Sequence, residues 1–191
     1  MPDHVNIPDE RIGVLIGEDG ATKRRIEERC EVAIEVDSES GAVAIDRDGD
    51  PLKGLKGPQV VKAIARGFPP ESALKLLQEV ESPGESMVYD SIDVKDATGS
   101  PSEFESKKGR LIGKDGRTRE LMEELTGADV RIYGSTVGAI GTTTQVRIAM
   151  EACEMILEGA PHGTVYSYME EQRSQFRGRE IAYYESGEEP I

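Results

Sequence analysis

The stretch that decides the fold of this chain is Leu111-Ile112-Gly113-Lys114-Asp115-Gly116-Arg117-Thr118-Arg119. It combines an apolar lead-in, a tight turn with two glycines three positions apart, and a basic run that opens a helix. An earlier copy, Leu15-Ile16-Gly17-Glu18-Asp19-Gly20-Ala21-Thr22-Lys23, lies 96 positions upstream. Two copies of one turn, each in a matching context, predict a duplicated structural unit.

The repeat continues beyond the turn at the same offset. The matched pairs are Gly13 with Gly109, Ile26 with Met122, Glu27 and Glu28 with Glu123 and Glu124, Ile34 with Val130, and Val36 with Ile132. A chain of 191 residues with 37% hydrophobic residues can form two small cores. We therefore expect domains at residues 1–82 and 83–160, followed by a C-terminal helix and flexible tail at 161–191. The run Ser82-Pro83-Gly84-Glu85-Ser86 marks the boundary.

The chemistry of such a turn follows from its atoms. Gly113 and Gly116 leave the backbone bare and permit positive φ. The next helix directs its free N–H groups and the positive end of its dipole at the same place, and Lys114, Arg117 and Arg119 add positive charge. The pattern predicts a site for a phosphodiester. The alternative is a plain corner between two helices, which the duplication and the basic flank disfavour.

Each unit has the predicted order strand, helix, turn, helix, strand, strand, helix. In the first unit the expected strands are residues 4–7, 32–36 and 42–46, and the expected helices are 8–16, 21–30, 58–66 and 70–79, with a loop at 46–57. In the second unit the expected strands are residues 88–94, 130–132 and 137–140, and the expected helices are 101–112, 117–126 and 143–157. An amphipathic stretch at 165–176 and a frayed end at 186–191 follow.

This order, with Leu-Ile-Gly-x-Asp-Gly at the turn, resembles the type I KH domain over most of the chain. The resemblance implies an α+β fold of two tandem KH domains. Each would have a three-stranded antiparallel sheet packed on three helices, with an added C-terminal helix. In KH domains a groove beside the turn holds about four single-stranded nucleotides; the turn clamps the backbone and aliphatic side chains contact the bases.

The resemblance assigns the RNA-binding residues of both units. In the second unit they are Gly113, Lys114, Asp115 and Gly116, with Arg110, Ile112, Arg117 and Arg119 beside them; in the first they are Gly17, Glu18, Asp19 and Gly20, with Lys23 and Arg24. The first turn carries acid at both variable positions, which opposes a phosphate, most strongly in weak salt. We therefore expect the second unit to bind RNA more strongly. Val130 and Ile132 belong to the strand beside the groove, and alternation leaves open which of them faces a base.

A narrower resemblance involves the two units, the segment Gly159-Ala160-Pro161-His162-Gly163-Thr164-Val165-Tyr166, and the charged helix after it. Together they resemble archaeal KH-domain ribosome-assembly proteins, relatives of the eukaryotic small-subunit assembly factor known as the partner of Nob. That family implies binding to small-subunit ribosomal RNA near its 3′ end, where an endonuclease trims the precursor. It also implies a protein partner, either that endonuclease or the alpha subunit of translation initiation factor two.

Two other functions remain open: a KH-fold scaffold for protein interactions, and an RNA-binding adaptor in translation initiation or RNA decay. Replacing Gly113 and Gly116 with aspartate is expected to separate the RNA-binding and scaffold functions. An RNA binder would lose affinity for single-stranded RNA with its fold intact, whereas a scaffold would change little.

The net charge of −14 has the wrong sign for an ordinary nucleic-acid binder. Acidic residues are spread along the chain, and its 9 lysines are outnumbered by 14 arginines. This composition resembles that of proteins from salt-loving organisms, whose acidic surfaces stay hydrated in concentrated salt. The alternative is an acidic cytoplasmic protein whose local basic patch suffices.

Other functions are disfavoured by the residues present. The two histidines, His4 and His162, have no nucleophile at a recognisable spacing, and Lys114 is followed by Asp115 where a nucleotide-hydrolase phosphate loop needs serine or threonine. Cys30 and Cys153 predict buried thiols in a reducing compartment. We expect a cytoplasmic protein that is not an enzyme, with no cofactor, metal or membrane partner.

Overall fold

The structure is a computed structural model that describes residues 2–47 and 49–186. Two compact units make up the chain, one within residues 1–78 and one within residues 79–191. In each unit three antiparallel strands form one sheet, with strand orders β1-β3-β2 and β4-β6-β5. The predicted α+β fold of two KH-like units is therefore confirmed.

The first unit follows the predicted order. Its elements are β1 (Asp3–Asn6), α1 (Asp9–Ile16), α2 (Ala21–Cys30), β2 (Val32–Val36), β3 (Ala42–Arg47), α3 (Pro51–Gly54), α4 (Gly57–Ala65), α5 (Pro70–Ala73) and a 3-10 turn at Leu74–Leu77. Two details differ from the predictions. The expected loop at 46–57 contains α3, because the Asp50 side chain accepts a hydrogen bond from the backbone N–H of Leu52 and Pro51 opens the helix. The expected helix at 70–79 is shorter, and its second half is the 3-10 turn.

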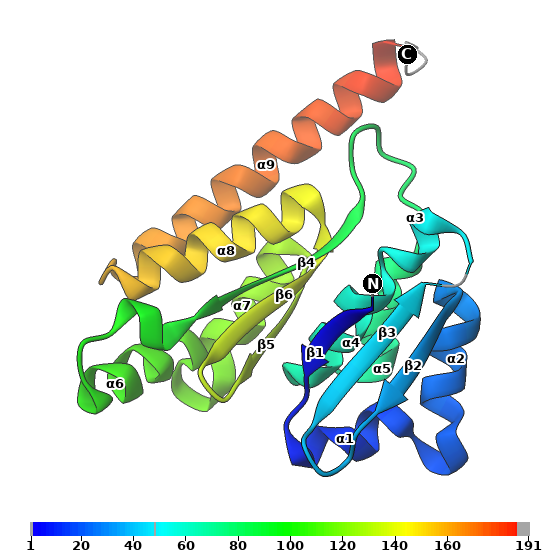
Figure 1. Cartoon of the computed structure of the whole chain (residues 1–191). Helices are drawn as coiled ribbons and strands as arrows, with labels where there is room; N and C mark the ends of the chain where they lie inside the picture. The colour runs from blue at the N-terminus through cyan, green and yellow to red at the C-terminus, as the bar shows by residue number, and fades with distance from the viewer. Residues whose placement is uncertain (1, 48, 187–191) are drawn as a thin grey trace. The chain divides into compact units, whose positions relative to one another are not determined.

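The second unit repeats this order and adds a long final helix (Figure 1). Its elements are β4 (Met87–Asp93), a 3-10 turn at Val94–Ala97, α6 (Pro101–Ile112), α7 (Arg117–Thr126), β5 (Asp129–Tyr133), β6 (Thr136–Thr142), α8 (Thr143–Leu157) and α9 (His162–Ser186). A short 3-10 turn, Glu18–Gly20 in the first unit and Lys114–Gly116 in the second, links the two helices that flank each Gly-x-x-Gly sequence.

Side-chain caps mark the N-termini of α6 and α8. The Ser100 hydroxyl accepts a hydrogen bond from the backbone N–H of Glu103, as the sequence predicts. The Glu103 carboxylate accepts in return from the N–H of Gly99, one residue before the position that a capping box uses. At α8 the box is complete, since Thr142 and Gln145 exchange both bonds. These caps set where α6 and α8 begin.

The C-terminal helix α9 packs on the second unit. Val165 and Met169 are fully buried and belong to the same hydrophobic core as Leu111, Met122 and Val130. The helix is longer than the predicted stretch 165–176 and ends at Ser186, so this residue of the expected frayed end is helical. Residues 187–191 lie outside the described part of the chain.

The two cysteines are buried core thiols. Burial raises the pKa of Cys153 to about 12 and that of Cys30 to about 11, so both stay protonated near neutral pH. A protonated thiol is a poor nucleophile and a poor metal ligand. None of the helices in the described residues is long and apolar enough to cross a membrane.

Candidate nucleic-acid interface

The two Gly-x-x-Gly turns have the same backbone. The φ and ψ angles are 72° and 177° at Gly17, and 77° and 173° at Gly113. They are 50° and 28° at Asp19, and 53° and 28° at Asp115. They are 77° and 14° at Gly20, and 77° and 9° at Gly116. Asp19 and Asp115 thus adopt the left-handed conformation that aspartate tolerates better than most residues. Differences in binding between the two turns are therefore expected from their side chains and surroundings and not from their backbone.

The first glycine of each turn is required by space as well as by φ. A Cβ built on Gly113 would lie 2.2 Å from Oγ1 and 2.7 Å from the backbone nitrogen of Thr118. At Gly17 the corresponding distances to Thr22 are 2.3 Å and 2.8 Å. A Cβ built on Gly116 would meet no atom of the described residues within 4 Å beyond its chain neighbours. The first glycine therefore lets the turn lie against the helix that follows, whereas the second supplies only the left-handed angle.

Both turns present uncapped helix starts. No side chain caps α2 at Gly20 or α7 at Gly116, so first-turn N–H groups face the turn without a side-chain acceptor. These groups and the helix dipole favour an anion at this place. Leu111 is fully buried beneath the second turn, while Ile112 stays half-buried at its surface. An apolar side chain thus lies next to the anion site.

The cations of the second turn differ in how freely they can meet a phosphate. Lys114 is exposed and has no carboxylate within ion-pair distance among the described residues. Arg117 lies 3.8 Å from Glu120, and with side chains 60% and 54% exposed this pair is weak. Arg119 is 2.8 Å from Glu123 and partly buried. Lys114 and Arg117 are therefore the cations best placed for a phosphate.

The first turn has less available positive charge. Glu18 and Asp19 are both exposed, and the Lys23 ammonium lies 3.0 Å from the carboxylate of Glu27. Arg24 is exposed and has no ion-pair partner within the described ranges. Arg25 of the same helix is likewise exposed and unpaired there. The first turn itself carries two carboxylates, whereas the second carries Lys114 and Asp115, so we still expect the second turn to bind RNA more strongly.

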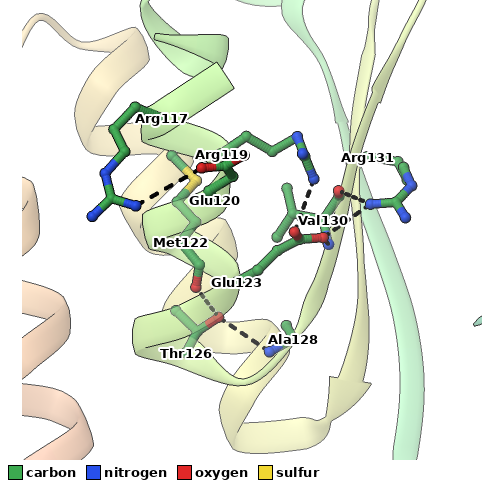
Figure 2. Close-up of polar contacts among 9 residues, drawn as sticks. All are labelled: Arg117, Arg119, Glu120, Met122, Glu123, Thr126, Ala128, Val130 and Arg131. Carbon is green, nitrogen blue, oxygen red and sulfur yellow. Dashed lines mark hydrogen bonds and ion pairs between the residues drawn. The ribbon is translucent and has the colours of Figure 1, made fainter. Parts of the chain in front are cut away.

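A glutamate in the helix after each turn binds the edge of the sheet. Glu123 of α7 accepts hydrogen bonds from the backbone N–H of Val130 at 2.9 Å and from the side chains of Arg119 at 2.8 Å and Arg131 at 2.9 Å (Figure 2). In the first unit Glu27 accepts from the N–H of Ile34 at 2.8 Å and from Lys23 at 3.0 Å. The sequence repeat matches Glu27 with Glu123 and Ile34 with Val130. Matching positions in a sequence do not, however, predict that the glutamate of the helix binds the strand.

This bond also orients the free edge of β5. Val130 donates to Glu123, and its carbonyl accepts from Arg131, so both of its backbone groups point away from β6. Because strand residues alternate, the N–H and C=O of Ile132 point the same way. Val130 and Ile132 both turn their side chains to the core, and only Ile132 stays partly exposed. The N–H and C=O of Ile132 are thus a donor and an acceptor on the free edge of β5, the strand that Glu123 joins to α7.

Replacing Glu123 with glutamine is expected to raise RNA affinity about threefold while lowering the free energy of unfolding by about 1 kcal/mol. The amide still accepts from Val130 but no longer neutralises Arg119 and Arg131. RNA titration and urea unfolding measure the two effects. Glu27→Gln is the matched control, since it releases only Lys23; equal affinity changes in both variants would contradict the prediction.

Comparison with known proteins agrees with this geometry. A family model described as "KH domain" matches residues 3–53, and one described as "Eukaryotic type KH-domain (KH-domain type I)" matches residues 88–174. A KH domain-containing protein of Methanocaldococcus jannaschii is 42% identical over 176 residues, which cover 91% of this chain and 74% of that protein. A chain in the solved structure of the a/eIF2alpha-aDim2p-rRNA complex from Pyrococcus horikoshii is 40% identical, with a TM-score of 0.79, covering 92% of this chain and 95% of that one.

The chain belongs to the archaeal Dim2 family of two-KH-domain proteins. Eukaryotic relatives are more distant: the pre-rRNA-processing protein PNO1 of Debaryomyces hansenii is 30% identical over 125 residues, or 65% of this chain. The chain spans 47% of the length of that PNO1.

One predicted site residue of this Dim2-family protein has a structural role. The Arg110 guanidinium donates to the carbonyl oxygens of Ile156, at 2.7 Å, and Ala160. It thereby caps the end of α8, where helix carbonyls lack partners. Arg11 does the same in the first unit, donating to Ile64 at 2.9 Å and Phe68 at 2.6 Å. Arg110 therefore has a structural role in the fold, and its contact with RNA stays a prediction.

The N-terminal residues of α9 brace the Gly113–Gly116 turn. The His162 Nε2–H donates to the carbonyl of Arg110 at 2.9 Å, and the His162 ring lies 6.1 Å from that of Tyr166. The Tyr166 hydroxyl lies 3.1 Å from Oγ1 of Thr118, the side chain that packs against Gly113. Both ring residues belong to the segment that carries the narrower family resemblance, but no pattern in the sequence predicts this bracing role.

Replacing Tyr166 with phenylalanine is expected to lower the free energy of unfolding by about 1 kcal/mol, because the buried Thr118 hydroxyl loses its partner. RNA affinity should fall about threefold as the turn loosens. Tyr168→Phe is the control, since the Tyr168 hydroxyl bonds to exposed Glu151, away from the turn. Urea unfolding and RNA titration report both effects; identical affinities for the two variants would speak against bracing.

Proposed function

We propose that this protein binds single-stranded RNA, chiefly through its second unit, and that it acts by binding and not by catalysis. The observation that carries the proposal is the turn Gly113–Gly116. It places an unpaired lysine at the uncapped start of α7, a helix that Glu123 joins to a strand edge with an outward N–H and C=O at Ile132. A backbone phosphate and a base edge need this combination.

We further propose that the RNA is small-subunit ribosomal RNA near its 3′ end, bound during ribosome biogenesis in the cytoplasm. The related P. horikoshii structure is a complex with ribosomal RNA and a/eIF2alpha, and PNO1 is by name a pre-rRNA-processing protein. The alpha subunit of initiation factor two is accordingly a proposed partner. The endonuclease that trims the precursor remains a predicted partner.

The decisive experiment is an NMR titration of the full chain with short single-stranded RNA in the salt at which the protein is folded. Amides of residues 113–118 and of Ile132 are expected to shift first, and the logarithm of affinity should fall with the logarithm of salt by about 0.7 per phosphate contacted. Binding to double-stranded RNA serves as the control. Absence of shifts at these amides, with the protein folded, would refute the proposal.

A second function, docking of a protein partner, is favoured only for the first unit. Its turn has the same backbone as the second, but exposed Glu18 and Asp19 repel phosphate. The same NMR titration tests this assignment, because shifts confined to the second unit would leave the first turn for a basic protein surface. Shifts of equal size at both turns would favour RNA binding by both.

A further inference from the structure

We infer that the second unit has an additional contact for RNA, a pocket between the end of α7, the start of α8 and α9, which takes an unpaired base with its phosphate. This inference rests on the proposed RNA binding and extends it to a surface outside the Gly-x-x-Gly groove. The pocket includes Arg173, Phe176 and Arg177 of α9, together with Leu125, Gln145 and Ile148.

The three α9 residues lie on one face of the helix, since they are spaced at i, i+3 and i+4. The same face is buried against the core one and two turns earlier, at Met169 and Val165. At Arg173 the face changes from apolar to basic, and Phe176 remains partly exposed. An aromatic ring that lines the same pocket as two guanidinium groups offers a stacking surface and two phosphate contacts.

The charges of the pocket are available to a ligand. Arg173 and Arg177 are exposed, and neither forms an ion pair or hydrogen bond with any side chain that the structure describes, which in this helix covers residues 162–179, 181 and 182. Glu124 is the carboxylate on the pocket wall, and no ion pair joins it to either arginine among the described residues. In a chain of net charge −14, two exposed arginines that line one pocket with a partly exposed aromatic ring indicate a polyanionic partner.

The size of the pocket fits a single ring. Its volume is about 220 Å³, below the range of roughly 300–1,000 Å³ that holds drug-sized ligands. Leu125 and buried Ile148 provide apolar walls, and Gln145 provides an amide. The pocket lies at the far end of α7 from the turn, a helix of 10 residues and therefore about 15 Å long. An RNA strand of more than four nucleotides is needed to reach both places.

The test compares single-stranded RNAs of about four and about twelve nucleotides with the full-length protein. Arg177→Glu is expected to lower affinity for the longer RNA about tenfold and to reduce its salt slope by about 0.7, with no effect on the shorter RNA. Phe176→Ala should also cost the longer RNA about tenfold. Arg177→Lys should retain most of the affinity, and a 4-thiouridine crosslink from the longer RNA should map to the α9 peptide.

Arg179→Glu is the matched control, because it makes the same charge change on the same helix two residues away, on a different face. Equal losses for Arg177→Glu and Arg179→Glu would overturn the pocket. A changed melting temperature of Arg177→Glu with unchanged RNA affinity would also overturn the pocket, because Arg173 and Arg177 would then only complement the dipole of α7. A pocket that binds an acidic peptide and not RNA would overturn it as well. If the unaltered protein binds neither the shorter nor the longer RNA, the proposed function itself is wrong. If it binds both RNAs equally well, only the proposed pocket is wrong.

Discussion

Replacing Lys114 with glutamate is expected to lower affinity for a four-nucleotide single-stranded RNA about thirtyfold, or about 2 kcal/mol. The change removes an unpaired cation from the second turn and puts a carboxylate there. It also converts Gly-Lys-Asp-Gly into Gly-Glu-Asp-Gly, the sequence of the first turn. Because the two turns have the same backbone angles, the altered turn should keep its shape. Fluorescence anisotropy at fixed salt measures the loss.

The reciprocal change, Glu18→Lys, provides the control. It gives the first turn the sequence of the second and should create or strengthen RNA binding there. The double variant has the net charge of the unaltered protein, so a general electrostatic effect cancels and only the location of the charge differs. If the double variant binds as the unaltered protein does at its second turn, Lys114 does not contact phosphate. NMR shifts at each turn separate the two sites.

Replacing Gly113 with alanine is expected to lower the free energy of unfolding of the second unit by about 3 kcal/mol and to abolish RNA binding. The added Cβ would be 2.2 Å from Oγ1 of Thr118, and φ is +77°. Overpacking and a left-handed angle each cost about 1–2 kcal/mol. Removing the Thr118 hydroxyl cannot restore the site, since the backbone nitrogen of Thr118 is 2.7 Å away. Urea unfolding reports the loss.

Gly116→Ala is the matched control, because its Cβ enters open space and costs only the strain of the angle, about 1 kcal/mol. Similar losses at both glycines would show that sterics at Gly113 do not matter. The same distances correct an expectation from the sequence: aspartate at Gly113 would not leave the fold intact. Aspartate at Gly116 alone is the cleaner test of RNA binding.

The sequence predicted the fold well because its signals are local. Alternating apolar residues define the strands, proline and serine define helix starts, and a repeat at 96 residues doubles each signal. The errors fall where one local signal hides another or where a helix outruns its apolar pattern. The helix α3 lies in a glycine-rich segment that is typical of a loop, and α9 continues well beyond its apolar stretch.

The candidate site was predicted less completely, since some of its residues act through partners distant in sequence. Arg110 resembles a phosphate contact by position, but the carbonyls that hold it are 46 and 50 residues away. Glu123 resembles a surface acid, yet it binds the edge of β5 and two arginines. A charged residue next to a motif therefore has no assigned role until its neighbours in space are known.

By itself the sequence determined that this protein has two similar turns, which residues they contain, and that one is basic and the other acidic. These properties follow from the order of residues along a few helical turns, where sequence neighbours are also neighbours in space. Only the tertiary structure decided which cations are free, why the first glycine admits no side chain, and how α9 supports the second turn. Those facts depend on atoms that packing brings together from distant parts of the chain, and no local pattern specifies them.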